Sequence, residues 1–296
     1  MRGRTMIMIG ILLCILMVGI VPPPLAAQEK PAQIVSVRVE KAPAIDGEAN
    51  DDAWKKSKAV QITVKRVLDP ERGKSTRVWL RSVHTDTHIY FLAVWEDDSE
   101  SISHRTWAWN PEKKAYEDAG DREDMFSLAF EHTGELDANM LSGVESVWDV
   151  WHWKAARTNP QGYAMDKTHR YTKDKPAGRA NEQTTTSGGK IWIARPEDAG
   201  DSVEKQIAAP TEFQVDRVPR YTPGTPTGSA ADVKAKGRWA SGRWTLELSR
   251  ALTTGNADDT PFDPKRSYRM AVGTFDKTGE MDKASGVLVL KFATRK

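Results

Sequence analysis

The chain has 296 residues, and its 43 Lys and Arg nearly balance 41 Asp and Glu. Interspersed charges of both signs form no basic field, which excludes a nucleic-acid-binding protein. The single cysteine is Cys14. The rest of the chain therefore cannot form disulfides, cysteine nucleophiles, iron–sulfur or zinc–thiolate sites, or the C-x-x-C-H attachment of haem.

The first 27 residues have the order of a secretory signal. Arg2 and Arg4 precede an apolar run from Met6 to Val21, and small residues lead to Ala27. We predict a signal peptide over residues 1–27 and a periplasmic or secreted mature chain. The apolar run has about 16 residues, whereas a membrane-spanning helix needs roughly 20. An uncleaved N-terminal anchor is the alternative, and contact with a membrane is expected only in that case.

Short runs rich in Val, Ile, Trp, Phe and Tyr, bounded by Gly, Pro, Asp or Asn, predict β-strands through the rest of the chain. The predicted strands cover residues 34–39, 60–64, 76–83, 88–95, 125–131, 147–153, 243–249, 268–275 and 287–292. A short helix is expected from Asp51 to Lys58 after Asn50 as N-cap, and a hairpin with its turn at Ala240-Ser241-Gly242. These elements predict an all-β protein, an antiparallel β-sandwich.

One domain is expected over residues 28–296, with a loop-rich insertion over about 167–235. The insertion holds Thr-Thr-Thr-Ser-Gly-Gly and Thr-Pro-Gly-Thr-Pro-Thr-Gly, and few apolar residues. Long loops within a compact domain are usually functional or disordered. Because Trp192 favours burial, we expect ordered, lid-like loops here rather than a linker.

Residues 148–164, WDVWHWKAARTNPQGYA, are the most informative segment. Tryptophans supply large apolar surface, and an ordinary core would have to pair the polar groups between them. The combination indicates a wall around a flat, amphipathic ligand. The alternative is a strand in which Trp151 and Trp153 face the core while His152 and Lys154 face solvent.

Other catalytic patterns receive no support. The six histidines lack H-E-x-x-H or H-x-H spacing, and neither a G-x-S-x-G elbow nor a glycine-rich phosphate loop is present. The pairs Asp51-Asp52, Asp97-Asp98 and Asp258-Asp259 fall at predicted turns, where Asp is expected for backbone reasons. A calcium or carbohydrate-hydrolysis role for these pairs is the alternative.

The segment WDVWHWKAARTNPQGYAMD resembles a signature of the ethylbenzene dehydrogenase-type haem-binding domain. This is a family of periplasmic haem subunits that accompany some molybdenum enzymes of the dimethyl sulfoxide reductase superfamily. Three further blocks follow in family order, at Ile45–Trp54, Gly242–Asp259 and Met270–Phe292. The first block also resembles the opening of carbohydrate-binding modules of family nine, which have a related β-sandwich fold.

The resemblance implies one non-covalent haem b with a methionine and a lysine on iron, which fall on Met140 and Lys283. Lys283 must then be neutral, which demands a desolvated site. Alternatively, Met140 is an apolar plug and Lys283 an exposed turn residue. Some relatives attach haem covalently near this methionine, whereas this chain has Ala-Asn-Met-Leu-Ser-Gly there. The other ligand candidates are His152, His132 and Met281.

The remaining residues of the tryptophan segment take supporting roles in this interpretation. Tryptophans would line the haem pocket, and cationic or polar residues would contact the haem propionates or a partner protein. The two sets are Trp148, Trp151 and Trp153, and His152, Lys154 and Arg157.

The resemblance implies an electron carrier or redox subunit rather than a catalyst. Its expected partner is a redox protein, such as a molybdoenzyme or iron–sulfur subunit or a c-type cytochrome. The alternative is a carbohydrate-binding-module-like protein without haem, whose eleven tryptophans stack on sugars. An accessory protein with no ligand is the third possibility.

Overall fold

The computed structural model describes residues 30–66, 73–277 and 283–294. The predicted signal peptide lies outside these ranges. Pro31–Lys296 forms one compact unit. Of the helices in the described ranges, none is both long and apolar enough to span a bilayer.

The predicted all-β fold is confirmed. Every predicted strand is present with ends within two residues of the expected ones, a normal uncertainty for element boundaries. They are β1 (Gln33–Arg38), β2 (Val60–Arg66), β3 (Thr76–His84), β4 (His88–Glu96), β7 (Met125–Thr133), β8 (Ser146–Lys154), β16 (Arg243–Ala251), β17 (Tyr268–Phe275) and β19 (Leu288–Phe292). The short helix α1 spans Asp52–Lys55, and its N-cap is Asp51 rather than Asn50.

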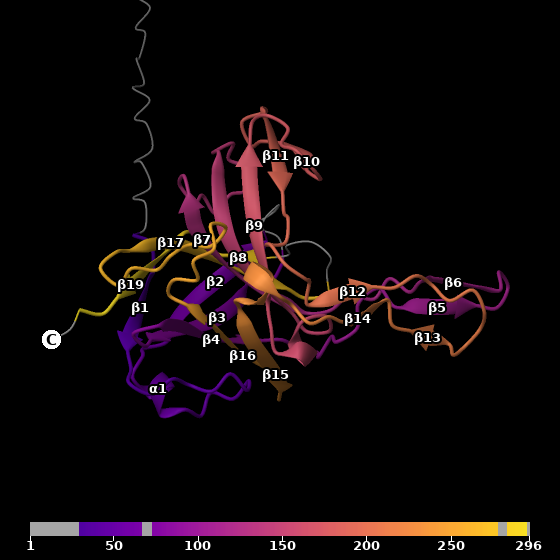
Figure 1. Ribbon diagram of the computed structural model, residues 1–296, viewed down its shortest axis with the longest axis horizontal. Helices are drawn as coiled ribbons and strands as arrows, with labels where there is room; N and C mark the ends of the chain where they lie inside the picture. Colours follow the sequence, from indigo (N-terminus) through magenta and orange to yellow (C-terminus); the bar gives the residue numbers. More distant parts are fainter. Residues whose placement is uncertain (1–29, 67–72, 278–282, 295–296) are drawn as a thin grey trace, which may run out of the picture. The chain divides into compact units, whose positions relative to one another are not determined.

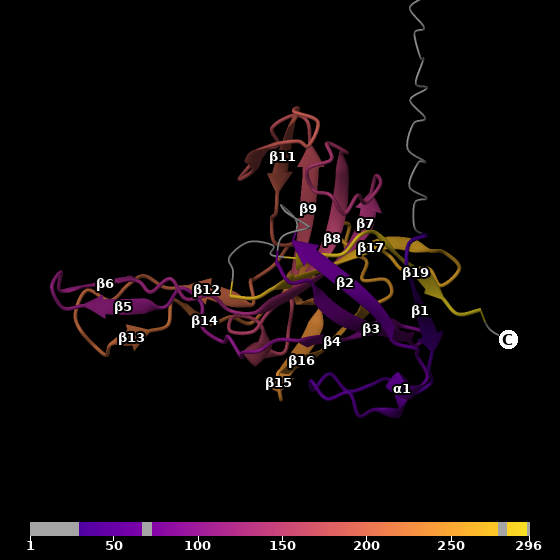
Figure 2. The ribbon, with the colours of Figure 1, turned by 180° about the vertical axis from the view of Figure 1, so that it is seen from behind.

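The strands form two facing layers of one continuous sheet (Figure 1). The first layer has the order β10-β11-β9-β8-β7-β17, and the second has the order β2-β3-β4-β16-β15, with β18 pairing between β17 and β2. The added strands are β9 (Met165–Thr172), β10 (Asn181–Thr184), β11 (Lys190–Ala194), β15 (Lys234–Ala240) and β18 (Lys283–Ala284). Neighbours within the layers are antiparallel, whereas β1 runs parallel to β19 and β3 (Figure 2).

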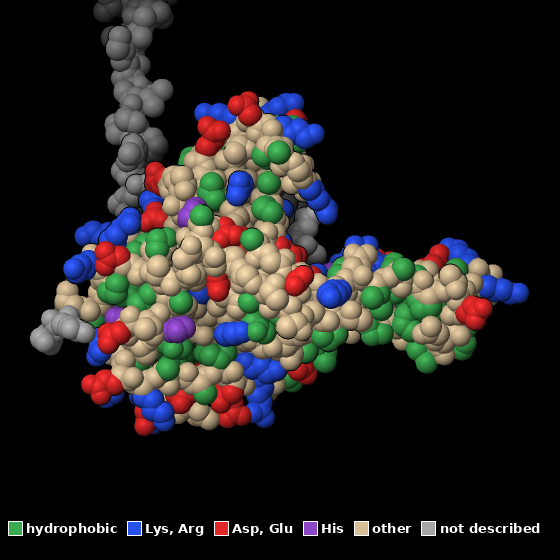
Figure 3. Space-filling model, viewed as in Figure 1, with side chains coloured by type: hydrophobic (Ala, Val, Ile, Leu, Met, Phe, Trp, Pro, Cys, Tyr) green, Lys and Arg blue, Asp and Glu red, His purple; other side chains and the backbone are tan. Residues whose placement is uncertain are grey.

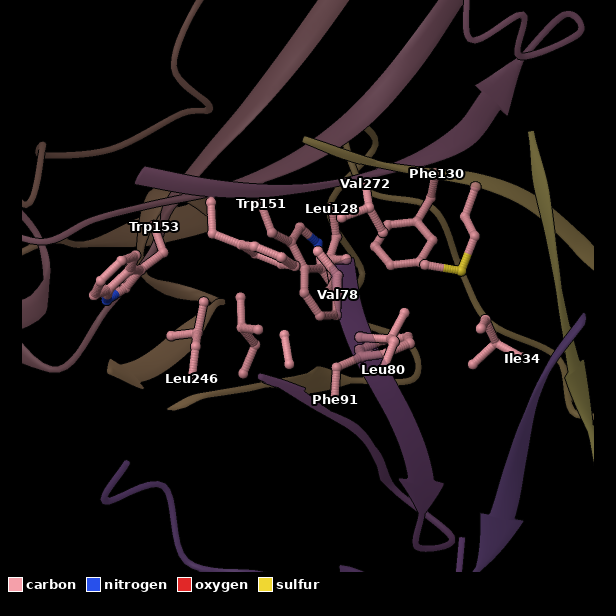
Figure 4. Close-up of a cluster of buried hydrophobic side chains, with 14 of the residues drawn as sticks. Ile34, Val78, Leu80, Phe91, Leu128, Phe130, Trp151, Trp153, Leu246 and Val272 are labelled. Atoms are coloured by element: carbon pink, nitrogen blue, oxygen red, sulfur yellow. The ribbon is translucent and has the colours of Figure 1, made fainter. Parts of the chain in front are cut away.

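The main core lies between the layers (Figure 4). Trp151 of β8 and Phe130 of β7 pack against Phe91 of β4, with ring centroids 5.0 to 5.7 Å apart. All three side chains have no exposed surface. Burial of one such side chain stabilises the fold by roughly 1.5–3 kcal/mol. We call the surface of each layer that faces this core its inner face, and the opposite surface its outer face.

The expected hairpin is confirmed between β15 and β16. Its turn residues Ser241 and Gly242 have φ of 51° and 75°. Positive φ at both central residues is the geometry that suits the twist of two-residue hairpins. A second glycine of β15, Gly237, makes room for Trp153, because a Cβ there would lie 2.4 Å from the indole Cζ2 atom.

The insertion over residues 167–235 differs from the expected loops because much of it forms strands. β10 and β11 extend the first layer, with Ile191 and Ile193 buried as anchors and Trp192 half-buried between them. All four residues of β10 are exposed. Backbone pairing with β11, rather than an apolar pattern, makes this segment a strand, and such pairing leaves little trace in the sequence.

Further short strands build an exposed arm, defined as β5 (Trp107–Asn110), β6 (Ala115–Asp118) and β13 (Arg217–Val218). A two-stranded sheet, β12 (Glu204–Gln206) with β14 (Tyr221–Pro223), lies beside it (Figure 1). The ring of Trp109 contacts Tyr116 and Phe213 at 5.1 and 5.3 Å. Phe213 remains 54% exposed, and apolar side chains are visible on the arm (Figure 3).

The buried Glu247 of β16 ties the N-terminal segment to the outer face of the second layer. Its carboxylate accepts hydrogen bonds from Asp46 N at 3.0 Å, Gly47 N at 2.9 Å and Trp54 Nε1 at 2.7 Å. Burial raises the pKa of Glu247 to about 7, although these three donors favour the charged form. The block Ile45–Trp54 therefore has a structural role, as the partner of a buried acid.

We expect the protein to be more stable at pH 5 than at pH 8. The folded state raises the pKa of Glu247 from 4.5 to about 7, so this stabilisation is complete below pH 4.5 and is lost as the pH rises through 7. Within that window, one such group lowers the free energy of unfolding by about 1.4 kcal/mol per pH unit. Urea unfolding between pH 5 and 8 measures the slope, which Glu247→Gln should reduce. An equal reduction in the control Glu96→Gln would contradict this assignment.

Candidate functional site

The alternation of β8 divides the tryptophan segment between two faces. Trp151 and Trp153 point to the inner face and have no exposed surface, whereas Trp148 points to the outer face. The indole N–H of Trp153 donates to Asn159 Oδ1 at 3.0 Å. Thus Trp151 and Trp153 are core residues, and the three tryptophans do not line one pocket. The period of two in a strand imposes this separation.

The outer face of the first layer carries a second apolar cluster, and Met140 belongs to it. The rings of Trp148 and Tyr171 lie 4.3 Å apart, and Met140 and Leu141 pack on the cluster from the preceding loop. Small side chains, Ala129 of β7 and Ala271 of β17, also contribute. A thioether thus lies at the border of an apolar surface. The buried hydroxyl of Tyr171 has no hydrogen-bond partner in the described ranges, and burial raises its pKa.

His152 lies farther along the same outer face. Its half-buried ring stacks on Phe275 with centroids 5.1 Å apart and planes at 29°. Its Nε2 atom is buried and has no hydrogen-bond partner among the residues that the structure describes. Burial, followed by the charges of Lys154 and Lys167, holds the pKa of His152 well below its usual range. The ring is therefore neutral at pH 7, which is the form that ligates metals.

The strand next to His152 leaves little room for larger side chains. Ser127 of β7 lies directly opposite His152, and Gly273 of β17 lies opposite Ser127. A Cβ atom at Gly273 would approach Ser127 Oγ to 2.6 Å. On the β7 side of the imidazole the sheet therefore carries only the small residues Ser127 and Gly273, whereas Met165 lies opposite His152 on the β9 side.

Lys154 and Arg157 are buried and paired with two glutamates. Lys154 Nζ lies 3.0 Å from Glu204 Oε1, which Arg157 Nη1 approaches to 3.1 Å. Arg157 also donates to Glu123, which has no exposed surface. Both cations, which were expected to contact haem propionates or a partner protein, thus pair with carboxylates of this chain. Sequence reasoning missed both glutamates because Glu204 is 50 positions from Lys154, and no local pattern joins them.

Lys283 lies on the opposite face of the sheet from Met140. In the register of β18 it stands opposite Thr274, which follows Val272 on the inner face. Its Nζ donates to Thr76 Oγ1 at 2.9 Å. The structure therefore does not bring the two predicted axial ligands together.

The other ligand candidates fall at different places. His132 lies at the irregularity of β7 between Glu131 and Thr133, and its Nδ1 atom is buried without a hydrogen-bond partner in the described part of the chain. Met281 lies outside the described residues. Of the candidates, Met140 and His152 share the outer face of the first layer.

A separate surface pocket of about 560 Å³ lies on the outer face of the second layer. Trp54 and Trp79 line it together with Arg81 and Arg243. However, Trp54 is 2% exposed, and the guanidinium of Arg77 lies 5.5 Å from the centre of the Trp79 ring. The pocket thus exposes only the indole of Trp79, which Arg77 partly covers, and not the faces of both tryptophans.

The chain belongs to the ethylbenzene dehydrogenase family, because the model of that family matches residues 51–285. Among curated proteins, none matches the chain. Similar solved structures include a carbohydrate-binding module of family nine from Caldicellulosiruptor kristjanssonii in complex with cellotriose, at 11% identity and a TM-score of 0.40 over 89% of this chain and 95% of that one. The same module with glucose has 11% identity and a TM-score of 0.39 over 90% and 97% of the two chains. A putative carbohydrate-binding protein from Bacteroides uniformis has 9% identity and a TM-score of 0.42 over 89% and 100%.

Proposed function

We propose that this protein binds one haem b non-covalently on the outer face of the first layer and transfers single electrons in the periplasm. The observation that carries the proposal is the buried, unpartnered Nε2 atom of His152 on the face that also holds Met140. Family membership supports it. Because no cysteine follows Cys14, the haem is held by coordination and packing alone.

The donor set of the outer face fits a haem. Thioether and imidazole are both established axial donors, and a thioether raises the reduction potential. We propose Met140 as the thioether donor and His152 as the nitrogen donor, in place of the Lys283 that the family resemblance implies. Lys283 is disfavoured because it lies on the inner face and donates to Thr76.

The bound haem would supply a one-electron iron couple, and the chain would orient it and exclude water. Phe275 holds the plane of His152 by stacking, and Trp148 with Tyr171 forms an apolar floor. Lys167 stands opposite Val150 on the same face, and burial lowers its pKa to about 8. An anionic propionate beside Lys167 would favour its charged form. We propose that the electron partner is another protein, either a molybdoenzyme or iron–sulfur subunit or a c-type cytochrome.

Protein purified from the periplasm should carry haem that acidified organic solvent extracts. Met140→Ala and His152→Ala should each change a low-spin absorption spectrum to a high-spin one, because each removes one donor. His88→Ala, at an exposed site, is the matched control and should leave the spectrum unchanged. A change in Lys283→Ala but not in His152→Ala would transfer the nitrogen ligand to Lys283.

A carbohydrate-binding protein without haem is the second candidate function, and the pocket beside Trp79 favours it. A colourless protein that takes up no added haem would overturn the haem proposal. Binding of oligosaccharides by that protein, lost in Trp79→Ala, would support the second candidate.

A further inference from the structure

A buried group of aspartates lies between the two layers, at the edge of the main core. Asp149 of β8, Asp166 of β9 and Arg250 of β16 all point to the inner faces, and each is at most 1% exposed. Asp259 joins them from the loop after β16 and is 3% exposed. Four elements of the fold thus converge on one charged centre.

One arginine lies beside three of these carboxylates. Arg250 Nη1 lies 2.7 Å from Asp149 Oδ2 and 2.6 Å from Asp259 Oδ1, but 3.8 Å from Asp166 Oδ2. The first two contacts are charge-assisted hydrogen bonds, whereas the third is too long to be one. Arg250 therefore compensates Asp149 and Asp259 and donates no hydrogen bond to the Asp166 carboxylate.

Several carboxylate oxygens here are buried and lack a donor. Neither oxygen of Asp166 has a hydrogen-bond partner in the described ranges, and the same holds for Asp149 Oδ1 and Asp198 Oδ2. Asp198 is 6% exposed, and its other oxygen accepts from Thr168 Oγ1 at 2.7 Å. Buried polar groups are nearly always paired, so four unpaired oxygens in two adjoining acidic groups point to a missing partner.

Carboxylate oxygens in two overlapping groups have a spacing that suits a cation. Ligand atoms of Asp149, Asp166 and Asp259 lie within 4.8 Å of one another, as do those of Asp198, Asp258 and Asp259. Oxygen ligands bind Ca²⁺ at about 2.3–2.6 Å, so two ligands on one ion are at most about 5 Å apart. Asp259 is common to both groups and joins them.

The charge balance favours a positive partner. Asp149, Asp166 and Asp259 lie within 3.8 Å of the one arginine, and Asp198 and Asp258 adjoin Asp259. An uncompensated carboxylate in a buried site is strongly destabilising. Carboxylate ligands alone, without histidine or cysteine, favour a hard cation. A flexible set from strands and loops suits Ca²⁺ better than Mg²⁺, which demands near-ideal octahedral geometry.

We propose that this aspartate cluster binds one Ca²⁺ ion, with ligands drawn from Asp149, Asp166, Asp198, Asp258 and Asp259. Asp166 supplies the oxygens that Arg250 leaves unpaired. The ion joins strands of the first layer to the loop after β16, and so it fastens the two layers at this end of the sandwich. This site lies on the inner faces and is separate from the proposed haem site.

The test uses the full mature protein at pH 7.5, freed of metal with a chelator and then titrated with CaCl₂. We expect one Ca²⁺ per chain by elemental analysis, and a rise in Tm of roughly 5–10 °C at a calcium concentration one hundred times Kd. Asp166→Asn should abolish both. The control Asp276→Asn removes a carboxylate from a different acidic group, formed with Asp97 and Asp124, and should retain both.

Three results would overturn the proposal. One is wild-type protein that neither contains nor binds Ca²⁺ and whose Tm does not respond. Another is loss of the response in Asp276→Asn but not in Asp166→Asn. The third is a wild-type Tm that does not change with Ca²⁺, together with an Asp166→Asn variant that is more stable than the metal-free wild type. That result would mean that the carboxylates share protons. If Asp166→Asn fails to fold, Asp198→Asn replaces it in the same test, and calorimetric titration of the wild type with CaCl₂ measures Ca²⁺ binding directly.

Discussion

Replacing Arg250 by methionine is expected to lower the free energy of unfolding by about 3–5 kcal/mol. Arg250 is 1% exposed and hydrogen-bonds to Asp149, Asp259 and the carbonyl oxygen of Thr260. Its guanidinium also lies 4.9 Å from the centre of the Trp151 ring. Methionine has a similar bulk, so the lost free energy of unfolding comes from the carboxylates that remain buried without a cation. Urea unfolding in calcium-free buffer with chelator measures it.

Arg269→Met is the matched control for this variant. Arg269 is 36% exposed and pairs with Glu135 at 2.8 Å, and exposed pairs of this kind contribute about 0–1 kcal/mol. Adding Asp149→Asn and Asp259→Asn to Arg250→Met should restore part of the stability, since those carboxyls no longer need a cation. Equal losses in Arg250→Met and Arg269→Met would contradict the buried charge network.

The strands of the sandwich were predictable because each carries its own apolar pattern. In β4, for example, Ile89, Tyr90, Phe91, Val94 and Trp95 are β-branched or aromatic residues that pack well on a pleated surface, and the strand lies where it was expected. β10 and the strands of the arm have no such pattern. These segments are strands because their backbones pair with neighbouring strands, and the sequence alone does not show which strands will be adjacent.

The candidate site was predictable only in part, for a different reason. Alternation along β8 can be read from the sequence, and it correctly places Trp151 and Trp153 on one face in the core. The alternation does not show that other segments also cover the opposite face of β8. The alternative interpretation of this segment therefore placed His152 and Lys154 in solvent, whereas Nε2 of His152 is buried and Lys154 is 4% exposed. The partners that bury and neutralise Lys154, such as Glu204, come from distant segments.

Trp151→Ala is expected to lower the free energy of unfolding by about 3–5 kcal/mol, the usual cost when a large aromatic side chain leaves a cavity in a core. The Trp151 ring contacts Phe91, Phe130 and Phe262 with centroids 5.0 to 6.3 Å apart, and these side chains come from both layers and a loop. The structure around the cavity cannot close without moving the layers. Urea unfolding monitored by circular dichroism gives the value.

Trp192→Ala provides the comparison for this loss of stability, because Trp192 of β11 is only half-buried. Its ring contacts Lys175 at 5.3 Å, an exposed cation–π interaction of about 0.5–1 kcal/mol. We therefore expect a much smaller loss there than in Trp151→Ala. If Trp151 instead formed the wall of a ligand pocket, its replacement would weaken ligand binding while stability stayed close to that of Trp192→Ala. A large loss of stability that is the same with and without haem would assign Trp151 to the core that holds the two layers together.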